Sequence, residues 1–174
     1  MRHIKTEGIV MSSKPFFEKD KLCQVYSPTL GRIQVLLKRA GKSGFKHGNG
    51  IESCTFIQAE LFRGKTFYYL NQSQITQTYL HIRADLGRID FAFYVFDIIR
   101  KATPEEQSNK PLFDLVSATL FRINEKEPIV TIRPWFHREF LAIEGLLESA
   151  TEAVSETAFK RAFEDYSGKI LPDR

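Results

Sequence analysis

The stretch TFIQAELFRGKTFYYLN, residues 55–71, decides the fold that this sequence predicts. Over residues 55–62 the apolar side chains alternate with more polar ones, which is the two-residue period of a β-strand. Arg63 and Gly64 interrupt this pattern, and a run rich in aromatic residues follows over residues 65–71. The stretch therefore predicts a β-hairpin with a two-residue turn at Arg63 and Gly64.

Three more runs of strand length lie before this hairpin. Residues 6–12 and 22–27 are short β-branched and apolar runs, separated by a charged segment that contains a proline. Residues 32–38 alternate between apolar and polar side chains. Since no helical period lies between them, five strands in about 75 residues predict a small closed barrel such as the OB-fold. An SH3-like barrel fits the strand count nearly as well.

The second half of the sequence has the period of helices. Apolar residues recur at three- and four-residue steps from Ile82 to Phe96, which predicts a long helix that ends near Pro104. The polar segment TPEEQSNKP is then expected to be a linker, and a second helix is expected with Pro111 in its first turn. The fold class predicted is α+β, an N-terminal five-stranded OB-fold barrel followed by an all-α helical bundle, with domains at residues 1–80 and 81–174.

The remaining elements of the bundle are less regular in sequence. Residues 129–135, bracketed by Pro128 and Pro134, predict a short extended piece or the start of a turn. A third helix is expected from Phe136 onward, and a fourth is expected to end at Gly168.

Charge is distributed unevenly along the 174 residues. Residues 1–80 hold 12 Lys or Arg and 5 Asp or Glu, a net charge of +7, whereas residues 81–174 hold 13 and 16, a net charge of −3. The first half is therefore the candidate for contact with a polyanion. No apolar run is long enough to span a bilayer and the N-terminus lacks a signal sequence, so a cytoplasmic protein without membrane contact is expected.

A glycine-spaced basic segment follows the third predicted strand, within residues 31–50. It has no carboxylate before Glu52, so its charge must face water or a polyanion. We interpret it as a phosphate-contacting loop; a solvated, disordered connector is the alternative. Together with the hairpin turn, it gives the candidate DNA-binding residues: Arg32, Lys38, Arg39, Lys42, Lys46, Arg63 and Lys65.

Aromatic residues beside this turn are candidates for stacking on nucleobases. Phe62 precedes the turn, and Phe67, Tyr68 and Tyr69 follow it. Since neighbouring strand residues face opposite sides, we expect Phe67 and Tyr69 on one face and Tyr68 on the other, with one set in the core.

Motifs of the commoner enzymes are missing from the sequence. It contains no GxSxG, GxxxxGK[ST], HExxH or GxGxxG, its four His are scattered, and its two Cys lie 31 positions apart. We therefore predict no catalytic residue, no metal site and no cofactor.

The first half of the sequence resembles the bacterial recombination mediator family RecO. The resemblance rests on an EGIVM run at residues 7–11 and on a Gly-Arg-Ile step at residues 31–33 that leads into a basic loop. Further on, the residues that resemble the first two helices of that family's bundle are Asp85, Leu86, Arg88, Ile89, Leu112 and Phe113.

The sequence departs from the family pattern in the basic loop, where Arg39 and Gly41 have exchanged places, and more largely in its second half. RecO proteins typically carry a four-cysteine zinc-binding insertion after the segment that corresponds to residues 141–147, and no Cys lies beyond residue 54 here. The chain is therefore expected to be a shortened relative that lacks the zinc module.

The resemblance implies a non-enzymatic protein that binds single- and double-stranded DNA and anneals complementary strands. It also implies action with RecR in loading RecA onto strands coated by single-strand-binding protein. Arg122, Arg133 and Arg138 in the helical half are candidate contacts for the acidic tail of that protein. Two alternatives are a zinc-free interaction module that docks partners without binding DNA, and an unrelated OB-fold RNA binder.

Overall fold

The computed structural model describes residues 3–38, 50–147 and 153–171. The chain divides into two compact units. The first, the barrel unit, comprises residues 1–79 and the segment Pro104–Lys110. The second, the helical unit, comprises residues 80–103 and 111–174. Since the chain runs from barrel to helices and briefly returns, a segment expected to be a linker is part of the barrel unit.

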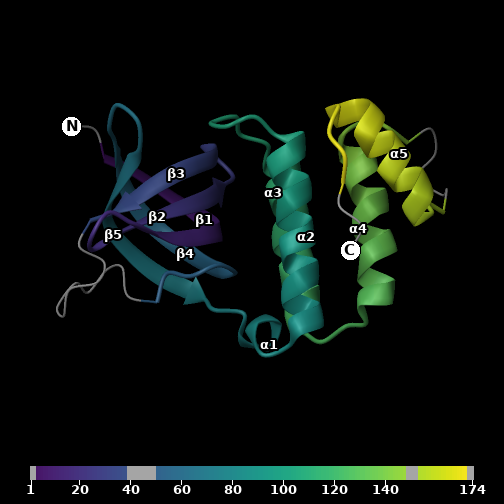
Figure 1. Ribbon diagram of the computed structural model, residues 1–174, viewed down its shortest axis with the longest axis horizontal. Coiled ribbons are helices and arrows are strands. Elements are labelled where there is room, and N and C mark those ends of the chain that lie inside the picture. The colour runs from purple at the N-terminus through teal and green to yellow at the C-terminus, as the bar shows by residue number, and fades with distance from the viewer. Residues whose placement is uncertain (1–2, 39–49, 148–152, 172–174) are drawn as a thin grey trace. The chain divides into compact units, whose positions relative to one another are not determined.

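In the part of the barrel unit that the structure describes there are five strands (Figure 1). They are β1 (His3–Phe16), β2 (Asp20–Ser27), β3 (Gly31–Leu37), β4 (Thr55–Arg63) and β5 (Tyr68–Gln77). The sheet closes in the order β1-β2-β3-β5-β4, with β1 antiparallel to β4 and β3 parallel to β5. This closed, OB-like barrel confirms the predicted fold, and the pairing of Val35 and Leu36 with Tyr68 and Tyr69 closes it between β3 and β5.

The barrel is filled by inward-facing apolar side chains contributed by all five strands. Val10, Val25, Ile33, Ile57 and Leu61 are each at most 2% exposed. Within β4 the buried residues Ile57, Ala59 and Leu61 are two positions apart, which is the alternation read from the sequence, and the intervening side chains lie on the outer surface. The fold of the barrel therefore follows from burial of one face of each strand.

The hairpin between β4 and β5 differs from the prediction. Arg63 pairs with Tyr68, so the connection has four residues, 64–67, closed by a hydrogen bond from the Gly64 N–H to the Phe67 carbonyl of 2.9 Å. The predicted two-residue turn at Arg63 and Gly64 is therefore wrong. Phe67 lies in the loop rather than on a strand, while Tyr68 is buried in the core.

The fifth strand also differs from the prediction, because it begins at Tyr68 and runs to Gln77 rather than spanning residues 65–71. Its second half, NQSQITQ, lacks apolar residues except Ile75 and has the composition of a loop. It is nevertheless a strand, since residues 72–77 pair with β4. Tertiary pairing outweighed local composition here.

Among its described residues, the helical unit has five helices (Figure 1). They are α1 (Leu80–Arg83), α2 (Leu86–Ala102), α3 (Lys110–Asn124), α4 (Ile129–Ile143) and α5 (Glu156–Ser167). Pro111 lies in the first turn of α3, and Gly168 ends α5 with a φ of 65°, both as predicted. No helix among the described residues is long and apolar enough to cross a membrane.

Two helix boundaries correct the predictions. The long helix expected from Ile82 is divided, because the Asp85 carboxylate accepts a hydrogen bond of 2.9 Å from the Arg88 N–H and begins α2 as its N-cap. Residues 129–135 are helical rather than extended: α4 begins directly after Pro128 and includes Pro134. A proline in the second turn removes one backbone hydrogen bond, and the buried side chains of Ile132 and Phe136 offset that loss.

Candidate nucleic-acid interface

An aromatic pair lies on the outer surface of the barrel where β4 and β5 are joined. Phe62 and Tyr69 occupy paired positions in the two strands. Because Leu61 and Leu70 beside them point into the core, these two rings face outward. They stack with centroids 5.1 Å apart and planes 9° from parallel. Both rings are half-buried, so part of their surface remains open to a ligand.

Gly64 allows the hairpin loop to lie against this pair. A Cβ at position 64 would come within 2.3 Å of Cε2 of Tyr69 and 3.0 Å of the Phe67 carbonyl oxygen. Any larger residue would push the loop away from the ring or displace the ring itself. The glycine therefore fixes the distance between the loop and Tyr69.

Three basic side chains surround the stacked rings. Lys38 follows β3, and its Nζ lies 5.1 Å from the centroid of the Tyr69 ring, a cation–π contact. Arg63 and Lys65 come from the hairpin. These residues line a hollow of about 650 Å³, here called the aromatic–basic hollow: Lys38, Phe62, Arg63, Gly64, Lys65 and Tyr69.

Arg63 is held by two contacts in the barrel unit. Its guanidinium pairs with the Glu106 carboxylate and lies 4.6 Å from the centroid of the Tyr68 ring. The hydrogen bond to Glu106 raises the pKa of Arg63, so the side chain stays charged. A phosphate that binds here must compete with Glu106 for the same guanidinium.

Arg32 has a similar acidic neighbour and is much less exposed. Its Nη1 lies 3.6 Å from Oε1 of Glu105, and its side chain is 11% exposed. Glu105 also accepts a hydrogen bond of 3.3 Å from Nε2 of Gln34, and the Glu106 N–H donates to the Arg32 carbonyl at 2.9 Å. Together with a parallel β-bridge between Arg32 and Glu105, these contacts hold the acidic segment Pro104–Lys110 alongside β3.

Glycine at position 31 allows the segment Pro104–Lys110 to lie this close to β3. Gly31 has a φ of 70°, and a Cβ there would lie 2.2 Å from the Gln107 carbonyl oxygen. The close approach of the two backbones brings Glu105 and Glu106 to the barrel arginines. We did not predict these two acids from the sequence; the only signal was their position in a segment expected to be a linker.

The predicted DNA-binding residues thus fall into three groups. Lys38, Arg63 and Lys65 meet in the aromatic–basic hollow, and Arg32 lies apart from it, against Glu105. The other three predicted residues, Arg39, Lys42 and Lys46, lie outside the described residues. The structure therefore brings together cations from two segments that are 25 positions apart in the chain.

The arginines predicted to contact a partner each have an acid or a ring beside them. Arg122 donates two hydrogen bonds to Oε2 of Glu127, at 2.8 and 2.7 Å, and its guanidinium lies 4.3 Å from the Trp135 ring centroid. The hydrogen bond from Arg122 lowers the pKa of Glu127. These contacts engage the Arg122 guanidinium at the C-terminal end of α3.

The other two predicted partner contacts differ in exposure. Arg133 pairs with Glu156 at 3.4 Å and is 21% exposed. Arg138 donates to the adjacent Glu139 at 2.8 Å and is 42% exposed, which makes it the most accessible of the three.

A metal site is not found in the part of the chain that the structure describes. No group of three or more His, Cys, Asp or Glu side chains there is arranged to hold an ion. Cys23 and Cys54 are both buried, and burial raises the pKa of the Cys23 thiol.

Comparison with known families covers both units of the chain. The family described as Recombination protein O N terminal matches residues 1–79, and Recombination protein O C terminal matches residues 83–146. The chain belongs to the recombination protein O family. The predicted family is therefore confirmed, while the absence of the zinc module stays a prediction.

Three relatives show how far the similarity extends. The DNA repair protein RecO of Alkaliphilus metalliredigens is 28% identical over 153 residues, covering 87% of this chain and 62% of the relative. The RecO protein of Caldanaerobacter subterraneus is 29% identical over 113 residues, which cover 65% of this chain and 46% of the relative. The RecO protein of one Dehalococcoides mccartyi strain is 29% identical over 174 residues, which cover 97% of this chain and 69% of the relative. The chain thus spans about half to two thirds of the length of these relatives.

Proposed function

We propose that this chain is a non-enzymatic DNA-binding protein of recombinational repair, acting in the bacterial cytoplasm at the nucleoid. It binds single- and double-stranded DNA on its barrel unit and anneals complementary strands. With RecR, it assists the loading of RecA onto strands coated by single-strand-binding protein. Membership of the recombination protein O family supports this proposal. The observation that carries it is the meeting of Lys38, Arg63 and Lys65 around the stacked rings of Phe62 and Tyr69.

The chemistry of the aromatic–basic hollow suits a nucleic acid. Lysine and arginine bind phosphates without regard to sequence, and each phosphate that they neutralise releases counterions. Aromatic rings stack on unpaired bases, which contributes about 1–3 kcal/mol per base. Both chemistries occur within one hollow of about 650 Å³, so a strand can be held by its backbone and by a base at once.

The other predicted basic residues have different parts in this proposal. Arg39, Lys42 and Lys46 lie within eight positions after Lys38 in the sequence, and we propose that they add positive charge for the DNA backbone. Arg32 would contribute less, because a phosphate can reach it only by exchange with the Glu105 carboxylate.

The test is the salt dependence of DNA binding. Fluorescence anisotropy with a labelled 20-nucleotide strand would measure affinity between 50 and 200 mM salt. Lys38→Ala and Lys65→Ala should each reduce the magnitude of the slope of log binding constant against log salt concentration by about one unit, because each removes about one phosphate contact. Arg161→Ala on α5 removes the same charge from an exposed position of the helical unit, and it should leave the slope unchanged.

Three results would contradict the proposal in different ways. Equal slopes for all four proteins would exclude the hollow as the DNA site. No binding by the parent protein would favour the zinc-free interaction module. Tighter binding of an RNA strand of the same sequence would favour the OB-fold RNA binder, since the 2′-hydroxyl distinguishes the two nucleic acids.

For the helical unit we propose contact with the acidic tail of single-strand-binding protein through Arg122, Arg133 and Arg138. Exposure supports Arg138 as the principal contact of the three. Arg138→Ala should therefore weaken binding of a peptide with that tail, measured by anisotropy, more than Arg122→Ala. Equal binding by the parent protein and the Arg138→Ala variant would contradict this contact.

A further inference from the structure

A second hollow lies on the outer surface of β1, β4 and β5, beside the aromatic–basic hollow. The strand register arranges the outward side chains in rows across these three strands. The first row contains His3, Phe62 and Tyr69. Successive outward rows are two residues apart along β1 and β4, about 6.8 Å, while a bulge in β5 makes the step from Tyr69 to Gln72 three residues. The next two rows are Lys5, Glu60, Gln72 and then Glu7, Gln58, Gln74.

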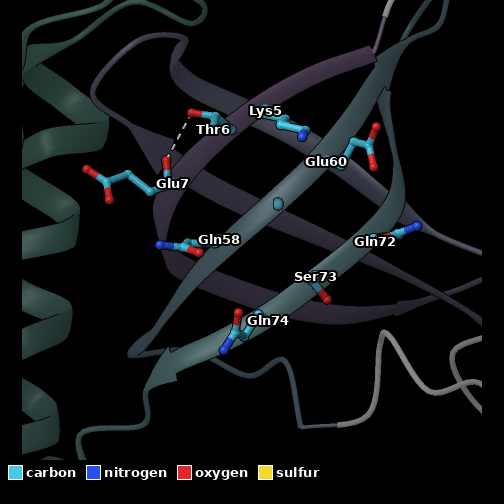
Figure 2. Close-up of a pocket in the computed structure, with 9 residues that line it drawn as sticks. Lys5, Thr6, Glu7, Gln58, Glu60, Gln72, Ser73 and Gln74 are labelled. Atoms are coloured by element: carbon cyan, nitrogen blue, oxygen red, sulfur yellow. Dashed lines mark hydrogen bonds between the residues drawn. The ribbon is translucent and has the colours of Figure 1, made fainter.

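The second and third rows form a groove of about 530 Å³, here called the amide groove (Figure 2). Three glutamine amides are spread over two strands, and all three glutamines are exposed. Figure 2 shows these side chains on the outer surface of the barrel, with Ser73 between Gln72 and Gln74 on β5. The residues that line the groove are Lys5, Thr6, Glu7, Gln58, Ala59, Glu60, Gln72, Ser73 and Gln74.

The charges in the amide groove are unfavourable for phosphate. One lysine and two glutamates line it, a formal charge of −1. The Glu60 carboxylate already accepts a hydrogen bond of 3.3 Å from Asn71 and lies 3.0 Å from Nδ1 of His3. By contrast, Lys38, Arg63 and Lys65 make the adjacent aromatic–basic hollow positive. A ligand that occupies both must therefore have an anionic part and a neutral, hydrogen-bonding part.

Amide side chains suit the neutral part of such a ligand. Each glutamine offers two N–H donors and a carbonyl acceptor, the combination that pairs with the donor and acceptor edges of nucleobases. The Watson–Crick edge of an unpaired base is free to pair with such an amide, whereas in a duplex that edge is engaged in the base pair and only the groove edges stay accessible. An amide that pairs with the Watson–Crick edge therefore requires a single strand.

We propose that the amide groove binds the unpaired bases of a single strand whose phosphates lie against Lys38, Arg63 and Lys65. Gln58, Gln72 and Gln74 donate to and accept from the Watson–Crick edges of these bases, and they give the barrel a preference for single strands over duplex DNA. This inference rests on the proposed function, because it requires DNA to be held at the aromatic–basic hollow.

The test compares three probes of equal length: a single strand, its duplex and an abasic single strand that keeps the phosphates but lacks the bases. The triple variant Gln58→Ala/Gln72→Ala/Gln74→Ala should bind the single strand about tenfold more weakly, because several hydrogen bonds are lost. Its affinity for the duplex and for the abasic strand should equal that of the parent protein. Its salt slope should also be unchanged, since no phosphate contact is removed.

Two further variants distinguish the loss of a base contact from a change in folding. Gln77→Ala/Gln107→Ala removes exposed glutamines outside the groove and should bind all three probes as the parent does. Gln58→Glu/Gln72→Glu/Gln74→Glu keeps the size of the side chains and adds negative charge, so it should lower single-strand affinity further. A normal melting curve for the glutamate variant with unchanged single-strand affinity would overturn the proposal.

The outcomes separate this inference from the proposed function. If the parent protein binds neither DNA form, the proposed function fails and this inference fails with it. If the parent binds both and the alanine triple variant keeps the same ratio of single-strand to duplex affinity, only the amide groove proposal is overturned.

Discussion

The barrel unit and the helical unit use aromatic and basic side chains in opposite ways. On the barrel, Phe62 and Tyr69 stack at the outer surface, with Lys38 beside them. In the helical unit, the Phe159 ring stacks on His137 in the interior, with centroids 3.8 Å apart and planes 2° from parallel. The same groups that are available to a ligand on one unit are used for internal packing in the other. We infer that the barrel binds nucleic acid through them, whereas the helical unit uses them for stability.

The interior of the helical unit also contains a polar contact. The Tyr94 hydroxyl lies 2.9 Å from Nε2 of His137, and the Arg133 guanidinium lies 4.9 Å from the Tyr94 ring centroid. The hydrophobic cluster of the barrel consists of apolar side chains, Cys23 and the ring of Tyr68, and Ser27 and Thr55 of the barrel strands are also fully buried. Buried polar groups specify one arrangement of the helices, because each needs a particular partner.

The largest effect is expected from loss of the buried ring. Phe159→Ala removes a side chain that contacts His137, Phe140 and Phe163, and it should lower the free energy of unfolding by about 3–5 kcal/mol. Chemical denaturation would measure this change in the free energy of unfolding. Phe121→Ala removes the same atoms from a residue that is 56% exposed, and it should cost far less. Similar losses for both variants would contradict the packing role of Phe159.

The second prediction concerns pH. Burial, with the nearby charges of Arg133 and Lys160, lowers the pKa of His137 from 6.5 to about 3. Between these two values the unfolded chain binds a proton that the folded chain does not. The contribution of His137 to stability is therefore complete above pH 6.5. It should be lost as pH falls toward 3, at up to about 1.4 kcal/mol per pH unit.

Denaturation at several pH values would measure this dependence. His137→Gln has no titrating group at this position, so its free energy of unfolding should change less between pH 6.5 and 5. An equal pH dependence in the parent and variant proteins would exclude His137 as the cause.

The outer face of the barrel is tested by the third prediction. Tyr69→Ala removes one ring of the stacked pair and should weaken single-strand binding by about 1–3 kcal/mol. Tyr69→Phe keeps the ring and should bind as the parent does. An equal loss on duplex DNA would show that Tyr69 maintains the fold of the hairpin rather than stacking on a base.

The sequence predicted the barrel more completely than the candidate site. The alternation at residues 55–62 and the apolar stripe of α3 were sufficient to predict those elements, because burial of one face determines them. Pro134 misled the prediction for α4, since the cost of one lost hydrogen bond is small beside the burial of neighbouring side chains. Likewise, the polar second half of β5 is a strand only because β4 pairs with it.

The candidate site depends on contacts that local sequence does not encode. Lys38, Arg63 and Lys65 were predicted from charge alone. Their meeting around Tyr69 depends on the parallel pairing of β3 with β5, between residues more than 30 positions apart. Glu105 and Glu106 reach the barrel because the chain returns from the helical unit, a path that no local pattern predicts.

The smallest effect is expected at these two acids. Glu105→Gln/Glu106→Gln releases Arg32 and Arg63 from their carboxylate partners and should raise DNA affinity several-fold at low salt. It should also increase the salt slope by about one unit. Glu125→Gln, which removes an exposed charge of the helical unit, is the matched control. A lower affinity in the double variant would show instead that the acids hold the arginines in place for binding.

The most direct test of the barrel as the nucleic-acid interface is photo-cross-linking. A single strand with 5-bromodeoxyuridine at several positions would be irradiated with the protein, and the cross-linked residues would be located by mass spectrometry. We predict cross-links at Phe62 or Tyr69, next to the cations of the aromatic–basic hollow. Cross-links confined to the helical unit, for example at Trp135 beside Arg122, would contradict the division of roles between the two units.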